Sequence, residues 1–96
     1  MKLYERITAE NWIQGTMRWG EKYCLVGHIN NLGDMSIEEY SGLREAIKTL
    51  YPERYSSGLE YSPGLESGSM FSLFKFNDHP ETTVEDVIRV CKVADV

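Results

Sequence analysis

The sequence of 96 residues lacks most of the features that mark specialised classes of protein. Its two cysteines, Cys24 and Cys91, are too few for a disulfide scaffold, so we expect reduced thiols and a cytoplasmic location. No apolar run approaches the roughly 20 residues that a membrane-spanning helix needs. The first six residues already carry several charges, which does not fit a secretory signal peptide.

Basic residues are also few. Ten Lys and Arg against fifteen Asp and Glu give a formal net charge of −5 and a pI near 4.9. Contacts to nucleic-acid phosphates need clustered Lys and Arg, and here the basic residues are scattered, so we expect no direct binding to nucleic acid. An acidic surface keeps a small protein soluble, and it can also face a basic surface on a partner protein.

What is present is ordinary globular composition, with 42% hydrophobic and 26% charged residues. The length suits a single domain over residues 1–96. A chain of this size buries roughly 60–65% of its unfolded surface, which is enough for one modest core.

The clearest predicted helix runs from Ser36 to Tyr51. Ser36 and Glu39 have the spacing of a capping box, in which each side chain accepts a backbone N–H of the other residue. Pro52 is expected to end the helix. One helical face gathers apolar side chains, those of Ile37, Tyr40, Leu43, Ile47, Leu50 and Tyr51.

A last helix is predicted from about Thr83 to Ala94. Its capping box is either Thr82 with Glu85 or Thr83 with Asp86, and the acidic side chains suit the positive end of the helix dipole. The expected apolar stripe consists of Val84, Val87, Ile88, Cys91 and Ala94.

A first helix is predicted to start at Thr8, whose hydroxyl suits an N-cap. Ile7 and Trp12 have the spacing of a hydrophobic staple around that cap. The two following glycines, Gly15 and Gly20, indicate that the helix ends between them.

The segments 23–29 and 70–76 are short apolar runs that periodicity alone cannot assign to helix or strand. We therefore expect an all-α domain of four or five short helices, with an α+β fold that pairs these two segments as strands as the alternative. Residues 30–34 are predicted to form a turn. Residues 55–69, rich in Ser, Gly and Tyr, are predicted to form a long irregular loop.

Three short motifs resemble a known family. They are Trp12-Ile13-Gln14-Gly15, Tyr23-Cys24-Leu25-Val26-Gly27 and Phe76-Asn77-Asp78-His79-Pro80-Glu81-Thr82. With these motifs the chain resembles an uncharacterised family of small proteins from actinobacteria and their phages. The resemblance spans nearly the whole chain, although Phe76 stands where the family usually has Trp and residues 51–69 match nothing in it. It implies a small, largely helical domain with no established activity.

Several side chains are candidates for chemistry. Cys24 and His28 are spaced i, i+4, so on a helix they would share a face, as a thiol and its base or two metal ligands must, and Cys91 and His79 could complete four N/S ligands for zinc. The spacing between these pairs fits no zinc pattern, and both cysteines lie in apolar runs. We therefore interpret the cysteines as buried core residues and expect no metal, no cofactor and no enzymatic activity.

Asp78-His79 looks like half of an acid–base pair, but adjacent residues seldom adopt the orientation that catalysis needs. We expect Asn77 or Asp78 to form an Asx-type turn instead, which leads through Pro80 to the cap at Thr82. Thr8, Trp12, Ser36, Asn77, Asp78 and Thr82 are thus predicted to be structural.

The residues predicted to bind a partner are aromatic or acidic. Trp19 lies among polar residues and glycine, and Tyr55 and Tyr61 lie in the predicted loop, so these three are candidate interface anchors. Glu38 and Glu39 open one predicted helix, and Glu85 and Asp86 open another. Together these four carboxylates are candidates for an acidic face.

The functional hypothesis that follows is a non-enzymatic protein–protein interaction module. The family resemblance and the acidic charge suggest an accessory protein of a phage or mobile element that inhibits a host protein, for example a nucleic-acid-binding defence complex, as an anti-CRISPR protein does. The alternative is a small ligand-binding protein or enzyme that uses Cys24, His28, Asp78 and His79. A third hypothesis is a homodimer that uses Trp19 and the loop.

Overall fold

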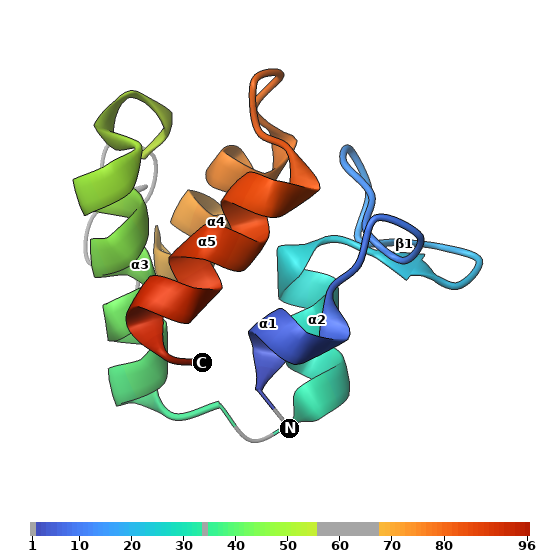
Figure 1. The fold of residues 1–96 in the computed structure, drawn as a ribbon, viewed down its shortest axis with the longest axis horizontal. Coiled ribbons are helices and arrows are strands. Elements are labelled where there is room, and N and C mark those ends of the chain that lie inside the picture. The colour runs from blue at the N-terminus through green and yellow to red at the C-terminus, as the bar shows by residue number, and fades with distance from the viewer. Residues whose placement is uncertain (1, 34, 56–67) are drawn as a thin grey trace.

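The computed structural model of the chain describes residues 2–33, 35–55 and 68–96 (Figure 1). Within them the fold is mostly helical, with one short antiparallel hairpin. The elements in chain order are α1 (Leu3–Arg6), β1 (Arg18–Trp19), β2 (Lys22–Tyr23), α2 (Leu25–Leu32), α3 (Ile37–Leu50), the 3-10 turn η1 (Pro52–Arg54), α4 (Gly68–Asp78) and α5 (Val84–Ala94).

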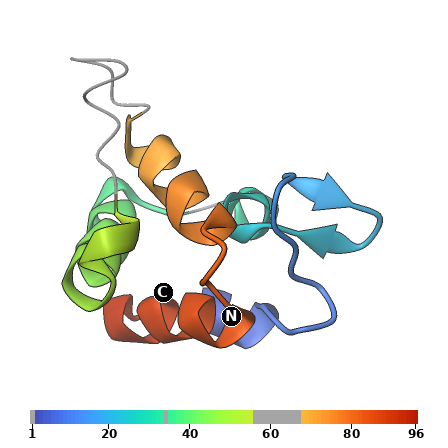
Figure 2. The same cartoon turned by 90° about the horizontal axis from the view of Figure 1, so that it is seen from above.

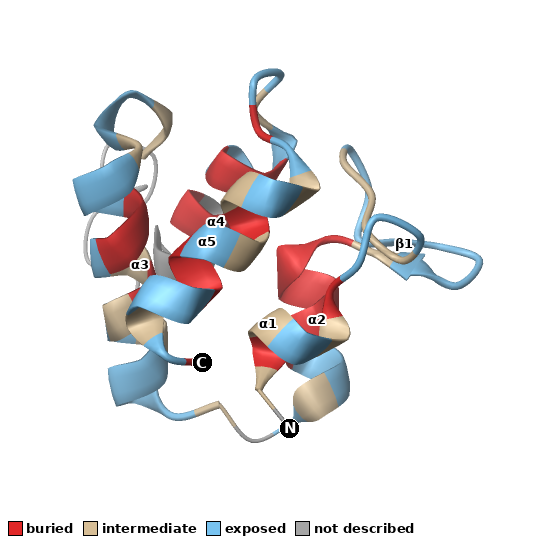
Figure 3. Ribbon diagram, in the orientation of Figure 1, coloured by how far each residue is buried: buried red, intermediate tan, exposed pale blue. Residues whose placement is uncertain are grey.

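The core lies between five helices of the described chain. Helix α5 packs against α3 and α1, and α4 packs against α2 and α3 (Figures 1 and 2). Helices α3 and α5 are antiparallel, because Tyr51 after the end of α3 donates a hydrogen bond to Asp86 at the start of α5, whereas Gly42 faces Ala94 at the end of α5. Fully buried side chains from every helix meet between them, among them Leu3, Leu25, Leu43, Leu73, Phe76 and Val87 (Figure 3).

Helix α3 confirms the predicted capping box. The Ser36 hydroxyl accepts from the Glu39 N–H (3.1 Å), and the Glu39 carboxylate accepts from the Ser36 N–H (2.9 Å). The predicted apolar face is too long, because Ile37 is 77% exposed and Leu50 is also exposed. Both lie in the terminal turns of the helix, whereas only its middle turns pack on the core.

Helix α5 uses the second of the two predicted capping boxes. Thr83 is the N-cap, and its hydroxyl accepts from the Asp86 N–H, while Asp86 accepts from the Thr83 N–H. Thr82 is buried one residue earlier and does not cap the helix. Of the predicted stripe, Val87 and Cys91 are fully buried.

Segment 23–29 is helical from Leu25 onward and 70–76 lies within α4, so these two segments do not pair as strands, and the small strand pair of the described chain is β1 with β2 instead. After Tyr23, the Cys24 sulfur accepts from the Gly27 N–H and caps α2, which then continues through the predicted turn to Gly33. Gly33 has φ +80°, the left-handed conformation that commonly ends a helix. In α4, Leu73, Phe76 and Asn77 are buried at helical spacing. Most of the loop predicted over 55–69 lies outside the described residues.

The helix predicted to start at Thr8 is wrong, since α1 covers only Leu3–Arg6. The Asn11 side chain holds the following residues in a turn, because it accepts from the Thr8 N–H (2.8 Å) and donates to the Arg6 carbonyl (2.7 Å). Beyond the turn, the backbone at residues 11–13 pairs with Tyr23 and is not free to form helical hydrogen bonds. Trp12 therefore makes no staple with Ile7.

The hairpin β1–β2 was not predicted from the sequence. It projects sideways from the helices (Figure 2), and its register pairs Arg18 with Tyr23 and Trp19 with Lys22. Gly20 has φ +63° and Glu21 does not have positive φ, which is the pattern of a type II′ turn. None of the described helices has the length and apolar character needed to cross a membrane.

Candidate functional site

A buried asparagine joins three parts of the chain. Asn77, at the end of α4, accepts two hydrogen bonds at Oδ1, from the Trp12 indole N–H (2.6 Å) and from the Leu25 backbone N–H (3.0 Å). Its Nδ2 donates to the Ile13 carbonyl (3.1 Å). Since Asn77 is fully buried, these bonds replace the water that its amide would otherwise bind.

Gln14 and Asp78 extend this network on both sides. The two N–H groups of the Gln14 amide serve three backbone carbonyls, those of Asn77 (3.0 Å), His79 (2.8 Å) and Thr82 (3.3 Å), so one N–H is shared. The Asp78 carboxylate accepts from the Gly15 N–H (2.9 Å). We call Trp12, Gln14, Leu25, Asn77 and Asp78 the Asn77 clamp, because together they tie residues 12–15 to the α4–α5 connection.

The base of the hairpin rests on the first turn of α2 beside this clamp. The Cys24 N–H donates to the Met17 carbonyl (3.1 Å). A Cβ added at Gly27 would lie 2.6 Å from that same carbonyl oxygen and 3.1 Å from the Tyr23 Cβ. Only glycine therefore lets the hairpin lie this close to α2, and both ends of residues 12–24 are fixed.

The outer part of the hairpin is exposed (Figure 3). The Trp19 side chain is 73% exposed and Met17 is 40% exposed. Arg18 lies over the Tyr23 ring (5.5 Å to the centroid) and donates to the Gly20 carbonyl (3.0 Å), which stiffens the turn. A large aromatic side chain is thus displayed on a fixed support, as an interface anchor must be.

The backbone edge of the hairpin offers little for strand addition. Strand β1 has two residues, and in this register only Arg18 directs its backbone groups away from β2. The Thr16 hydroxyl donates to the Arg18 carbonyl (3.3 Å) and covers that acceptor. What the hairpin presents is therefore its side chains, above all Trp19.

The four predicted acidic residues do not lie on one face. Because α3 and α5 are antiparallel, Glu38 and Glu39 lie at one end of the helix pair, and Glu85 and Asp86 lie at the other. Asp86 also faces inward to Arg54 (2.9 Å). Burial alone would raise the pKa of the Asp86 carboxyl, but hydrogen bonds from Arg54, Thr83 and Tyr51 outweigh burial and lower that pKa.

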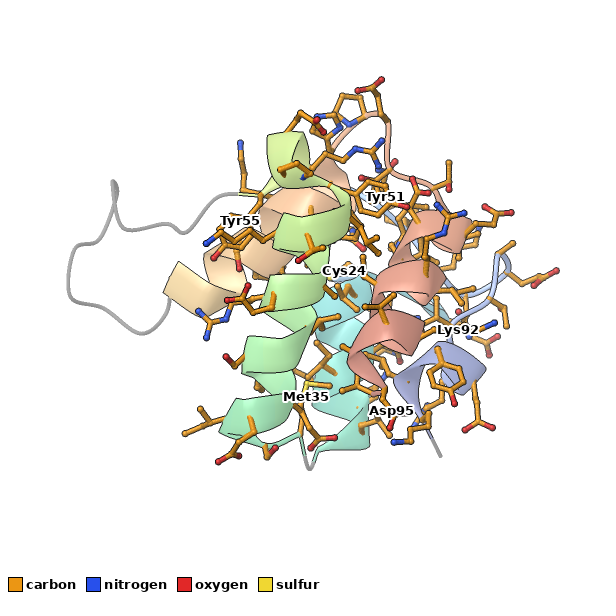
Figure 4. The ribbon with its side chains drawn as sticks, turned by 60° about the vertical axis from the view of Figure 1, so that its left-hand side comes forward. Cys24, Met35, Tyr51, Tyr55, Lys92 and Asp95 are labelled. Carbon is orange, nitrogen blue, oxygen red and sulfur yellow. The ribbon has the colours of Figure 1, made fainter. Side chains whose placement is uncertain are left out.

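The predicted loop tyrosines are only partly covered by the structure. Tyr55 is half-buried against the core, and Figure 4 shows it on the far side of α3 from Lys92. Tyr61 lies outside the described residues. Trp19 lies in the hairpin and Tyr55 follows η1, so these two candidates come from different elements.

The two cysteines are core residues. Cys24 lies in the interior (Figure 4), and burial raises the pKa of its thiol. Burial likewise raises the pKa of Cys91 to about 12, so neither thiol forms a thiolate readily at neutral pH. His28 is also buried, its Nε2 donates to the Asn11 carbonyl (2.9 Å), and burial lowers its pKa.

The structure does not bring Cys24, His28, Asp78 and His79 into one site. Asp78 and His79 line a cavity of about 240 Å³ together with Glu53, Arg54, Tyr55, Lys75 and Pro80, whereas Cys24 and His28 line no part of it. Across the described part of the chain, no three His, Cys, Asp or Glu side chains are placed to share a metal ion.

From the sequence, Trp12 and Asn77 are each predicted to be structural, but the hydrogen bond between them is not predicted. Gln14, Gly27 and the hairpin were not predicted either. A signal for the hairpin was present, because Gly20-Glu21 between Trp19 and Lys22 is a two-residue loop with glycine first. The three motifs behind the family resemblance also meet at the Asn77 clamp, which no periodicity could indicate.

A comparison with family models shows that the chain belongs to a family of unknown function (DUF6197), whose model matches residues 2–95. No similar protein was found among curated proteins, and no similar structure among solved structures.

Proposed function

We propose that this member of a family of unknown function is a non-enzymatic protein-binding module, and that the Trp19 hairpin is its contact element. The observation that carries the proposal is the 73% exposure of Trp19 on a hairpin whose base is fixed. A partner that covers this side chain removes its apolar surface from water, which is favourable. Tryptophan is also among the side chains most enriched at the centres of interfaces.

The fixed base supports the proposal because rigidity reduces the entropy lost on binding. The Asn77 clamp holds residues 12–15, the Met17 carbonyl is bonded to Cys24, and the type II′ turn sets the tip. A side chain on a preorganised support loses less conformational freedom when it docks than one on a flexible loop.

The absence of a convergent reactive site among the described residues also favours binding over catalysis. Both thiols are buried with raised pKa values, and His28 has a lowered pKa. A nucleophile needs an exposed, activated group next to a base, which these side chains do not form.

A finer form of the proposal is that the bound protein belongs to a host and is inhibited by this chain. The net charge of −5 and the family resemblance support that form. The placement of the acidic residues at opposite ends of α3 and α5 makes the hairpin, not a continuous acidic face, the element to test first.

The test is photo-crosslinking in a native host lysate, with a photoreactive amino acid placed at Met17 beside Trp19. We expect one specific crosslinked protein of a different sequence, identified by mass spectrometry. The product should disappear when Trp19→Ala is added. The matched control places the same group at Val93, an exposed apolar position on α5.

Two results would contradict the proposal. One is the same set of crosslinked proteins from Met17 and from Val93, because that would reflect general surface collisions. The other is a specific product that persists undiminished in Trp19→Ala. Melting temperatures of the variants confirm that each is folded.

The alternative of a ligand-binding protein is favoured by one observation, the cavity that Asp78 and His79 line. Its mixed basic and acidic lining suits a small polar molecule. A metabolite panel followed by NMR tests this alternative. Chemical-shift changes that centre on His79 and vanish in His79→Ala would favour it, and no shift with any metabolite would reject it for that panel.

A further inference from the structure

A second cavity lies at the end of the molecule where α1, the end of α2 and the start of α3 meet. It has a volume of about 310 Å³. Figure 4 shows Met35, which lines it, at the same end as Asp95. Dry apolar cavities of about 150 Å³ hold benzene, so this one has room for the larger indole ring of a tryptophan.

The lining of this cavity combines apolar and acidic side chains. The apolar ones are Leu3, Leu32, Met35 and Val96, and the acidic ones are Glu5 and Glu39. Among the described lining residues the one cation, Lys2, is already held by Asp95, through its carboxylate (3.4 Å) and its carbonyl (2.9 Å). The described lining is therefore part apolar and part charged, and its charged side chains have a net negative charge.

Each rim carboxylate keeps an oxygen for a further contact. Glu5 uses Oε1 to accept from the Lys2 N–H, and Glu39 uses Oε1 to accept from the Ser36 N–H. These backbone contacts hold both side chains in place. Hydrogen bonds from Ser36 lower the pKa of Glu39, so this carboxylate is charged at neutral pH.

The Trp19 hairpin carries more positive than negative charge. Its exposed apolar side chains, Trp19 and Met17, lie near two cations, Arg18 and Lys22, and one carboxylate, Glu21. The ion pairs found among the described residues use neither of these cations. By its register, Lys22 is the cross-strand neighbour of Trp19.

We propose that the Trp19 hairpin of one molecule docks into the Glu5–Glu39 cavity of a second copy of this chain. The indole enters the hollow, and Lys22, which lies on the same face of the hairpin as Trp19, meets the rim carboxylates. The proposal rests on the proposed function, because it takes the hairpin to be a protein-binding element. A hairpin cannot reach the cavity of its own molecule, because its base is clamped and it projects away from the helices (Figure 2).

The two halves of this contact lie on different parts of one molecule, so the contact is heterologous. Two copies close into a dimer if each hairpin fills the other's cavity, and otherwise the contact extends into longer chains. One hairpin and one cavity are smaller than the roughly 1,200–2,000 Å² of stable interfaces, so we expect a Kd between about 10 µM and about 1 mM. A partner protein that takes Trp19 would compete with this self-association.

The first test is sedimentation velocity of the full chain from about 1 µM to about 1 mM. We expect the mass to rise above that of a monomer with concentration. Trp19→Ala should weaken association by at least about 30-fold, as loss of a central aromatic anchor does. A matched control, Ile37→Ala, removes another exposed apolar side chain and should leave association unchanged. A monomer at every concentration overturns the proposal.

The second test uses complementary variants. Trp19→Ala keeps its cavity but lacks the anchor, and Met35→Trp keeps its anchor but has a filled cavity. Each should be monomeric alone, and their mixture should form a one-to-one heterodimer. No heterodimer in the mixture overturns the proposal, as does association of Trp19→Ala alone.

A charge exchange provides the same test without filling the cavity. Lys22→Glu should weaken association by about tenfold or more, and so should Glu5→Lys with Glu39→Lys. Mixing these two variants should restore it. A mixture that stays as weak as each variant alone contradicts the proposed contact.

Failure of this inference is distinguishable from failure of the proposed function. A monomeric protein that still crosslinks a different protein at Met17 leaves the function intact and rejects self-docking. An oligomer that depends on Trp19, with no crosslinked protein other than its own copies, supports self-docking and rejects an external partner.

Discussion

Single residues in this chain carry contacts that no neighbouring position can replace. The Asn77 side chain alone satisfies two donors and one acceptor that come from Trp12, Leu25 and Ile13. The sequence indicated a polar turn at this position, because Asn and Asp favour local turns. It could not indicate that the partners lie more than fifty residues away, since no local pattern encodes a contact at that distance.

We expect Asn77→Ala to lower the free energy of unfolding by about 3 kcal/mol, because it leaves buried donors and an acceptor without partners. Chemical denaturation measures the change. Asp78→Ala removes two hydrogen bonds, from the Gly15 N–H and from the Asn77 Nδ2, but leaves the other bonds of Asn77 in place, and should cost about 1–2 kcal/mol. Equal effects of the two substitutions would argue against the central position of Asn77.

Gly27 and Gly42 form a matched pair of helical glycines. Gly27→Ala would place a Cβ 2.6 Å from the Met17 carbonyl, and we expect it to destabilise the fold by about 1–3 kcal/mol. Gly42→Ala meets only the Ala94 Cβ at 4.0 Å and should stabilise the fold by about 0.5–1 kcal/mol. Thermal melts of both variants check the opposite signs.

At the scale of elements, the sequence predicted best where capping signals and periodicity agreed. Helices α3 and α5 start at predicted capping boxes, Ser36 with Glu39 and Thr83 with Asp86. The helix predicted to start at Thr8 was wrong, because Thr8 is equally suited to the turn that the Asn11 side chain closes. The hairpin was missed because its strands have two residues each, too few for any alternation to be visible.

We expect Thr83→Ala to lower stability by about 1 kcal/mol, because α5 loses the hydroxyl that accepts from Asp86. The control is Thr49→Ala, at an exposed position within α3, where the change should stay within about 0.5 kcal/mol. Urea midpoints compare the two. Indistinguishable midpoints would mean that the cap contributes little.

At the scale of the whole molecule, the charges are distributed so that no continuous acidic face exists over the described helix starts. The sequence gives the net charge of −5, but only the antiparallel arrangement of α3 and α5 separates Glu38 and Glu39 from Glu85 and Asp86. Charge totals follow from composition, whereas the location of charge depends on tertiary packing.

The buried histidine should make global stability depend on pH. Burial lowers the His28 pKa in the folded state below its ordinary value of 6.5, so the unfolded chain binds the proton more readily. Well above pH 6.5 His28 is neutral in both states and has no effect, and stability should fall as the pH drops through 6.5. His28→Gln should flatten melting temperature against pH from about 6.5 to 5. If the dependence of melting temperature on pH is the same in His28→Gln as in the original chain, other titrating groups cause the loss of stability at low pH.

The Asn77 clamp also has a kinetic consequence. Trp12 and Asn77 are 65 positions apart, so their contact closes a long loop of chain, and such closure is entropically costly before other contacts form. We expect the helices to associate first and the clamp to form after the folding barrier. Stopped-flow experiments on Asn77→Ala should then show faster unfolding and nearly unchanged folding. The clamp would act as a latch that sets the lifetime of the folded state and, with it, the time for which Trp19 stays in place.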